Sequence, residues 1–537
     1  MASPTVDQQD PGIRQHIPLL SILMLGLFIV FMNQTVLSVA MPRMMTDFNV
    51  GATTIQWLST GFMLVNGALI PLSAFLIQRY GTRKLFLLAM TLFTIGTFIC
   101  GIAPNFSVIL IGRLIQAAGG GILQPLVMTI IMFIFPPEIR GRGMGIFGLA
   151  MMFAPAIGPT LAGWVIEHYS WRVMFYGMVP LSVIVVILAF FTLKNVLEPK
   201  PVKLDYLGAS LSLLGVAALL YGVSEAGTEG WTDLIVLSTI LIGVIALVVF
   251  VVQQLRSESP LLDFKVFKYD MFSLSNMISA IITVSMFTGL FLLPIYLQSL
   301  RGFTPLESGI LMLPGALIMA VMSPVSGVLF DKLGPRPLAI VGMIITIMTT
   351  YEFTTLTPET GYSTLLVIYM IRSFGMSLLM MPIMTAGMNQ LPENLNAHGT
   401  AMTNTIRQVS GAIGTSLVTT IYSNRTSFHV STLGNQMSAT DPVFVQTFQS
   451  FVQSIIQSAH QNAEQAQQTA MAMLSGQIRL QANVLGINDA FFWATGFTII
   501  GLVLSVFLRD VRKDKKREEE KRNKDIRLLP SPINETK

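Results

Sequence analysis

Long apolar stretches recur along most of this chain and are separated by short polar segments. A transmembrane helix needs about 20 apolar residues, because each residue rises ~1.5 Å and the hydrocarbon core of a bilayer is ~30 Å thick. Fourteen stretches meet this requirement, and we expect helices at residues 18–41, 54–77, 85–103, 107–133, 143–166, 172–193, 206–226, 233–253, 271–298, 305–330, 337–356, 363–388, 399–422 and 488–508. The pattern predicts an all-α polytopic membrane protein.

The composition fits a protein that is embedded in lipid. Of the 537 residues, 52% are hydrophobic and only 11% are charged, and the mean hydropathy is +0.66. An ordinary water-soluble protein does not have this balance. The single cysteine, Cys100, excludes an intrachain disulfide and, with five scattered histidines, a Cys/His metal cluster. The sequence shows no nucleotide-binding motif and no catalytic constellation, so we expect neither an enzyme nor a bound cofactor.

Basic residues fall mainly on one side of the predicted helices. Most of the 33 Lys and Arg residues lie in the two tails and in every second loop. Because basic loops stay in the cytoplasm, we expect a multi-pass protein of the cell membrane with cytoplasmic tails at residues 1–17 and 509–537. The net charge of +5 is then a topology signal and does not indicate a nucleic-acid partner.

Two parts of the chain repeat each other. The loop AFLIQRYGTRK at 74–84 and the loop GVLFDKLGPRP at 327–337 share a small residue, a Leu, a basic residue, a Gly and an Arg in register. Arg113 and Arg372 each lie inside a predicted helix, ten to twelve residues before a proline. Both matches are shifted by eight predicted helices, and an even shift preserves the orientation of the helices in the membrane.

The repeat predicts two parallel six-helix bundles, an architecture that is typical of transporters. The first bundle is expected at 18–193 and the second at 271–508, where the second includes a long outer loop at 423–487. The linker at 194–270 then contains two inserted helices, the seventh and the eighth.

These motifs make the chain similar to the major facilitator superfamily, and in particular to its fourteen-span drug:proton antiporters of the EmrB/QacA type. The two repeated loops resemble the family's loop motif between the second and third helices and the second copy of that motif. Four further matches follow in order along the chain: IGRLIQAAGGG from Ile111, APAIGPTLAGW from Ala154, SWRVMFYGMVP from Ser170 and HGTAMTNTIRQVSGAIG from His398. The resemblance covers residues 17–508 and implies the major facilitator fold, fourteen transmembrane helices and antiport driven by a proton gradient.

Glycine and proline in the helix at 143–166 offer a surface for close helix packing and allow a bend. The residues concerned are Gly158, Pro159 and Gly163. Without the family, generic helix packing is the better explanation of them. The resemblance implies that the bend seals one side of a cavity and marks export rather than uptake.

The two repeated loops are implied to clasp neighbouring helix ends and so to favour one of two access states. Their candidate residues are Arg79, Gly81 and Arg83 in the first loop and Asp331, Gly334 and Arg336 in the second. Positive-inside charge alone would also place arginines there. The first loop departs from the family pattern, because Gln78 occupies its acidic position.

Arg113 is the strongest candidate site residue. A cation inside a span costs about 2.5–3.5 kcal/mol on insertion scales, so it should face a cavity or a partner. Asn33 lies ~12 Å and Arg113 ~9 Å below the outer ends of their helices, at ~1.5 Å per residue. We therefore expect the amides of Asn33, Gln34 and Gln116 to accept hydrogen bonds from Arg113.

The proton-coupling residue is harder to assign. The related antiporters have an aspartate where this chain has Asn33, and an amide does not titrate. Of the few carboxylates within predicted helices, we prefer Glu352 to Glu225, because Glu352 lies in the second repeat and Glu225 in the insert. An interfacial side chain that reaches water is the alternative for both. Arg372 and Arg407 are further cations within helices, for which bonding between helices is the plainer explanation.

The outer loop at 423–487 contains an amphipathic pattern. Apolar residues from Phe444 to Ile456 follow helical spacing, and a second helical stretch is expected at 465–485. We predict a helical hairpin over the outer mouth. A passive connector on the bilayer surface, a lid and a docking site for a separate adaptor protein, such as some EmrB-like proteins use, all remain open.

The sequence thus predicts a secondary active exporter of drug-like amphipathic molecules, driven by an ion gradient. The resemblance implies that the ion is the proton and that antibiotic resistance is the phenotype. An exporter of one endogenous metabolite or lipid is the nearest alternative. A non-transporting membrane sensor, from a different class, would need a signalling domain, and the sequence shows none.

Overall fold

The computed structural model describes residues 11–510 except 200, 203, 228, 258–259, 437–441 and 460–461, so most of both predicted tails lies outside the described residues. The described residues form helices and no strand, which confirms the all-α prediction. The long helices are α1 Pro11–Phe48, α2 Ala52–Leu69, α3 Ser73–Ile102, α4 Phe106–Ile134, α5 Arg140–His168, α6 Arg172–Thr192, α7 Tyr206–Ala226, α8 Leu234–Arg256, α9 Asp270–Ile295, α10 Pro305–Leu333, α11 Pro335–Glu352, α12 Tyr362–Ser377, α13 Met380–Met388, α14 Asn396–Gln436, α15 Pro442–Ala459 and α16 Ala463–Ser505. The short helices are η1 Phe264–Lys268, η2 Tyr296–Leu300, η3 Phe353–Thr355 and η4 Glu393–Leu395.

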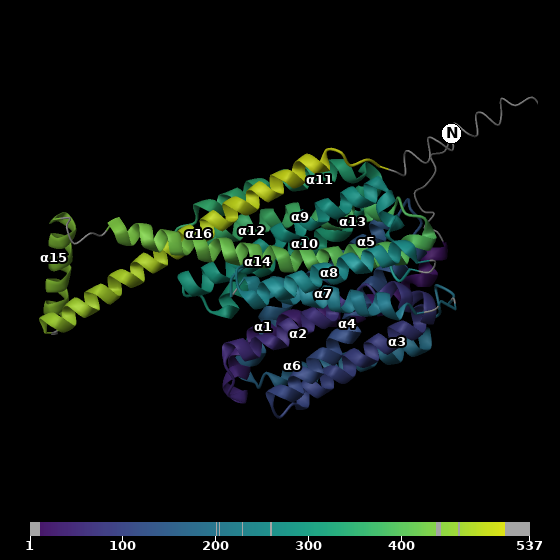
Figure 1. Cartoon of the computed structure of the whole chain (residues 1–537), viewed down its shortest axis with the longest axis horizontal. Coiled ribbons are helices and arrows are strands. Elements are labelled where there is room, and N and C mark those ends of the chain that lie inside the picture. Colours follow the sequence, from purple (N-terminus) through teal and green to yellow (C-terminus); the bar gives the residue numbers. More distant parts are fainter. Residues whose placement is uncertain are drawn as a thin grey trace, which may run out of the picture.

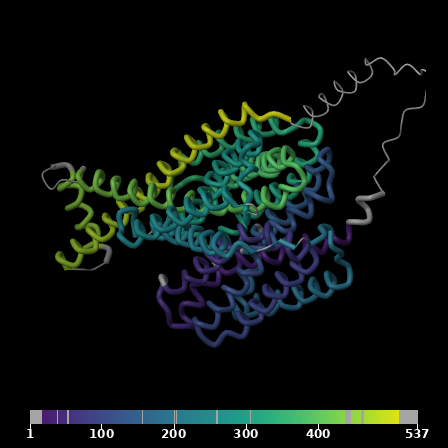
Figure 2. Tube along the Cα trace, turned by 45° about the vertical axis from the view of Figure 1, so that its right-hand side comes forward, coloured from purple at the N-terminus to yellow at the C-terminus, as the bar shows by residue number. Residues whose placement is uncertain are grey.

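The helices gather into two bundles. Helices α1, α2, α3, α4 and α6 lie in the lower part of Figure 1, and α9, α11, α12, α13 and α16 lie in the upper part. Figure 2 shows the same division from a second direction. Helix α5 of the first bundle packs along α10 of the second. We call the end at which α1 begins and α16 ends the tail end.

Polar side chains begin several helices at the positions where backbone amides need acceptors. Asn105 caps α4, Asp205 caps α7 and Asp233 caps α8, each by accepting a hydrogen bond from a backbone amide of the first turn. Thr304 and Glu307 form a reciprocal capping box at the start of α10. These caps fix the residues at which the four helices begin.

The number of spans differs between sequence and structure. All fourteen predicted stretches are helical, but twelve described segments are apolar and long enough to cross a bilayer. Helices α2 and α14 are absent from that set. In α14 the polar residues Asn404, Arg407 and Gln408 lower the hydropathy. The count of fourteen is therefore not confirmed, although the helices themselves are present.

The glycines of the repeated loops make the chain reversals at the tail end. Gly81 has φ 74° and ψ 170°, and Gly334 has φ 86° and ψ 178°. A positive φ of this size strains any residue with a side chain, so both motifs need glycine at this point. The reversal at Gly81 lies inside α3, which therefore contains the end of the second predicted span as well as the third.

The inserted helices bridge the two bundles on one side. Helix α7 packs on α8, on α2 of the first bundle and on α14 of the second. Its apolar residues Val216, Leu220 and Val223 form a cluster with Ala412 of α14. The insert thus covers the junction between the bundles.

Helices α14 and α16 project beyond the bundles and carry α15 between them (Figure 1). The amphipathic helix predicted from Phe444 to Ile456 is confirmed as α15, and the stretch predicted at 465–485 is part of α16. Ile455 of α15 packs on Ala466 and Ala470 of α16.

The position of this hairpin refines the prediction. α15 stands away from the bundles in both views, beyond the end opposite the tail end, and its role at the outer mouth stays a prediction. The 41 residues of α14 span about 60 Å, twice the ~30 Å of a hydrocarbon core. Because α14 continues as one helix beyond its predicted span, it carries α15 away from the bundles.

Candidate functional site

Arg113 is buried in α4, with 1% of its surface exposed. Its Nη1 donates to Asn33 Oδ1 at 2.5 Å and to Gln116 Oε1 at 2.9 Å, and its Nε donates to the carbonyl of Leu58 at 3.3 Å. The centre of the guanidinium lies 4.3 Å from the ring of Phe62. We call these five residues the Arg113 cluster. Its acceptors satisfy the cation inside the protein rather than in lipid.

Further hydrogen bonds fix the orientation of the two amide side chains in the cluster. Asn33 Nδ2 donates to Met178 Sδ at 3.3 Å, and Gln116 Nε2 donates to Thr97 Oγ1 at 2.8 Å. These bonds orient both amide oxygens toward Arg113. The expected contacts of Asn33 and Gln116 with Arg113 are thus present, while their part in transport or coupling stays a prediction.

Gln34 does not join this cluster. Its side chain is exposed, on a different side of α1 from the buried Asn33. Adjacent helical residues point about 100° apart at 3.6 residues per turn, so both amides could not face one cation. Leu58 and Phe62 of α2 take the place that we had expected Gln34 to fill. The sequence carries no signal for them, because one acts through its backbone and the other is an ordinary apolar residue.

Arg372 is the corresponding buried cation of the second bundle. It lies in α12, is 5% exposed, and its Nη2 donates to the carbonyl of Ser285 at 2.6 Å. Its Nε donates to Thr350 Oγ1 at 3.4 Å. A Cβ at Gly289 would lie 2.3 Å from Arg372 Nη1, so α9 needs glycine here to admit the side chain. This cation is held by helix-to-helix and carbonyl bonding, the plainer of the two explanations.

At the tail end, Asp331 of α10 caps the start of α5 across the two bundles. Its carboxylate accepts hydrogen bonds from the backbone amides of Gly141 at 3.0 Å and Arg142 at 3.1 Å. A carboxylate is stabilised there because it meets unpaired amides and the positive end of the helix dipole. Thr129 and Thr400 also bond at 2.7 Å between α4 and α14. The bundles are therefore tied together at the tail end.

The first repeated loop makes the equivalent contact without a charge. Gln78 Nε2 lies 2.9 Å from Nε2 of His398, at the start of α14. Burial lowers the pKa of His398 below its ordinary value, and the nearby Asp263 carboxylate partly opposes this. A neutral imidazole opposite a neutral amide replaces the carboxylate that Asp331 supplies in the other repeat.

The arginines of the loops differ in what they contact. Arg83 Nη2 donates to the carbonyl of Phe190 at 2.7 Å, near the end of α6, so it clasps a neighbouring helix end as expected. Arg79 and Arg336 are exposed. Within the described part of the chain, neither has a hydrogen bond or an ion pair, so the clasp expected of them is not seen.

The small residues of α5 permit close approach to other helices. A Cβ at Gly158 would lie 2.2 Å from Thr35 Oγ1 of α1, whereas one at Gly163 would meet only Leu306 of α10, at 3.4 Å. Gly158 is therefore the critical position of the two. α5 continues through Pro159, whose side chain is not among those the structure describes.

Glu352 lies exposed at the last residue of α11, and Glu225 is partly buried near the end of α7. The structure brings neither into the Arg113 cluster. The coupling role of Glu352 stays a prediction.

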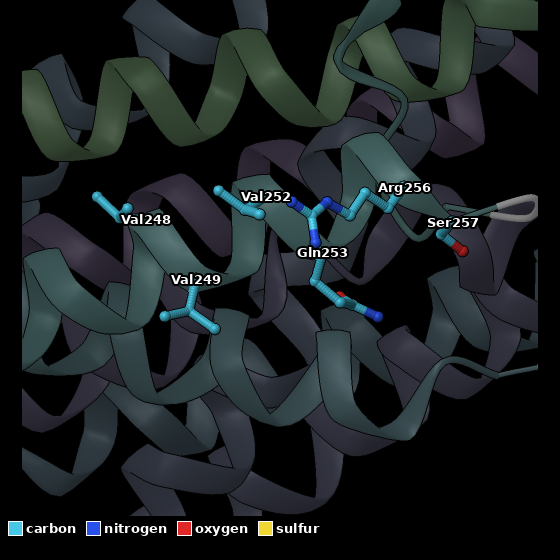
Figure 3. Close-up of a pocket in the computed structure, with 6 residues that line it drawn as sticks. All are labelled: Val248, Val249, Val252, Gln253, Arg256 and Ser257. Atoms are coloured by element: carbon cyan, nitrogen blue, oxygen red, sulfur yellow. The ribbon is translucent and has the colours of Figure 1, made fainter.

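A surface hollow of about 530 Å³ lies elsewhere, on inserted helix α8 (Figure 3). Its walls include Val248, Val249, Val252, Gln253 and Arg256, all from one helix. It contains no residue of the Arg113 cluster or of the contacts at the tail end. We therefore place the candidate site at the Arg113 cluster and the contacts at the tail end, and not in this hollow.

The fold and its buried cations define a multi-span membrane transporter built from two parallel helix bundles. Residues 23–415 match the model of the Major Facilitator Superfamily. The chain belongs to this superfamily, as its motifs predict.

Two relatives and one solved structure extend this comparison. The chain is 63% identical to the uncharacterized MFS-type transporter YhcA of Bacillus subtilis, over 98% of each chain. It is 35% identical to the lincomycin resistance protein LmrB of Bacillus subtilis, over 93% of this chain and 96% of that one. The crystal structure of the human organic anion transporter MFSD10 matches with a TM-score of 0.62 and 12% identity, over 93% of this chain and 100% of that one. The last likeness shows the fold alone.

Proposed function

We propose that this transporter is a secondary active exporter of amphipathic, drug-like molecules, driven by proton antiport across the cell membrane. Both termini are cytoplasmic in this proposal, so the tail end faces the cytoplasm. The observation that carries it is the closure of that end, where Asp331 caps α5 and Thr129 bonds Thr400 between the bundles. Such contacts must break for a substrate to enter from the cytoplasm, as alternating access requires.

The direction and breadth of transport rest on likeness and on packing. A relative that matches nearly the whole chain is named for lincomycin resistance. The close face at Gly158 fits the motif that marks export in the family that the sequence resembles. An exporter of one endogenous metabolite or lipid would share the same fold, so substrate range separates the two functions.

A panel of drug susceptibilities, measured with and without expression of the chain, tests this proposal. Resistance to several unrelated amphipathic compounds is the expected result. Resistance to a single compound favours the metabolite exporter. If expression raises resistance to no compound in the panel and vesicles export none of them, the proposal of an exporter is wrong.

A further inference from the structure

Arg407 lies where α14 leaves the closed contact between the bundles. All residues from Ala397 to Asn404 are buried, whereas all residues from Thr405 to Ser410 are partly exposed. Arg407 is eleven residues along the helix from Asn396, about 17 Å from its start. Half of a ~30 Å hydrocarbon core is about 15 Å, so the guanidinium lies near the middle of the membrane.

Helices of both bundles meet at this residue. Arg407 Nη1 donates to Met151 Sδ of α5 at 3.1 Å, and Nη2 donates to Asn404 Oδ1 at 3.1 Å. Asn404 in turn lies 3.6 Å, from Nδ2 to Sδ, from Met128 of α4. The cation therefore stands at the junction of the two bundles, beside thioethers that adapt to ligands of different shape.

Protein acceptors only partly satisfy this cation. A guanidinium has five N–H donors, and in the described part of the chain Arg407 donates to one weak sulfur acceptor and one amide oxygen. Helices α4 and α14 contain no Asp or Glu, and the one acid of α5, Glu167, lies at its far end. A partly exposed cation at mid-membrane without a counter-charge is costly unless an anion joins it.

We propose that Arg407 binds the anionic group of the transported molecule, so that the preferred substrates are amphipathic organic anions such as carboxylates or sulfonates. This inference rests on the proposed function and names its substrate class. The planar fork of arginine pairs with a carboxylate through two parallel hydrogen bonds. The buried methionines at the junction, Met128 and Met151, lie beside the apolar body of the ligand.

Binding of two matched probes tests this assignment. Pyrenebutanoate and pyrenebutylammonium share one apolar body and carry opposite charges. Their dissociation constants are measured on the full-length protein in nanodiscs of phosphatidylcholine, a lipid without net charge. We expect the anion to bind at least about 10-fold more tightly, because hydrogen bonds to charged groups contribute about 1.5–3 kcal/mol.

Variants separate a ligand-binding role from a structural one. Arg407→Gln should weaken binding of the anion about 10-fold and leave that of the cation within about 2-fold, as one lost charge-assisted contact predicts. Arg407→Lys should keep most of the preference. The control Arg479→Gln, at an exposed site on α16, should keep it as well. Size-exclusion profiles check that each variant is folded.

Equal affinity of the wild type for both probes, binding of neither, or an equal loss of both in Arg407→Gln would overturn the anion site. Transport of the same probes separates this failure from failure of the proposed function. Export of the cation and not of the anion would support the proposed function and contradict the proposed substrate class. Binding of the anion at Arg407 without export of either probe would support the site and contradict the proposed function.

Discussion

Arg113 and Arg407 are both arginines inside membrane helices, and both bond an asparagine, but their surroundings differ. Arg113 has acceptors from α1, α2 and α4 and lies on an aromatic ring, with 1% of its surface exposed. Arg407 is partly exposed and has one amide and one thioether as partners among the described residues. A cation that the fold satisfies holds the fold together, whereas a cation left unsatisfied is available to a ligand.

The largest expected effect comes from removing the satisfied cation. Arg113→Ala should reduce export to the level of empty vesicles while the protein still inserts, because Asn33 and Gln116 lose their shared partner and no span loses hydrophobicity. Efflux from reconstituted vesicles, normalised to the inserted protein, measures this. A near-wild-type rate would show that the Arg113 cluster is dispensable.

Filling the contact beside the cluster should have the next largest effect. A side chain at Gly158 would collide with Thr35, two residues after Asn33, so Gly158→Leu should reduce efflux at least about 10-fold by separating α1 from α5. Gly177→Leu is the matched control, because nothing lies within 4 Å of its Cβ position. Equal efflux by the two variants would make Gly158 an ordinary packing position.

A smaller effect is expected from trimming one acceptor of Arg113. Asn33→Ala removes one of the three hydrogen bonds that Arg113 donates, so at the low end of the about 1.5–3 kcal/mol for a bond to a charged group transport should fall about 10-fold. Asn33→Asp places a carboxylate beside Arg113 and should slow exchange by forming a tight ion pair. If both variants transport at the wild-type rate, Asn33 has no role beyond helix packing.

The smallest effect is expected at Glu352, which is exposed at the last residue of α11 and lies outside the Arg113 cluster. If it carries protons, Glu352→Gln should lower gradient-driven efflux several-fold and leave the dissociation constant of the substrate unchanged. Parallel transport and binding measurements distinguish the two effects. Full gradient-driven transport by this variant would contradict the coupling assignment.

Much of the architecture follows from the sequence, because hydropathy and the repeated loops determine the helices and their parallel halves. The contact of Asn33 with Arg113 also followed from matching their depths. The partners from α2 did not, since a backbone carbonyl such as that of Leu58 leaves no pattern in the sequence. The continuation of α14 beyond its span was missed because hydropathy reports the part of a helix in lipid and not where the helix ends.

The sequence also could not show that Arg113 has several acceptors while Arg407 has few. Both residues look alike in an apolar stretch, and only the arrangement of helices from distant parts of the chain decides which cation receives acceptors. Gln34 shows the converse, because its neighbour Asn33 faces the cluster while helix geometry turns Gln34 away.

Transport into inside-out vesicles with an imposed pH gradient tests the central claim most directly. With an acidic lumen, protons leave as the compound enters, so we predict uptake of the compound that rises with the gradient and stops when a protonophore collapses it. The Arg113→Ala vesicles should show none of this uptake. Uptake that is equal with and without the gradient, or equal in wild-type and Arg113→Ala vesicles, would contradict proton-driven export by this fold.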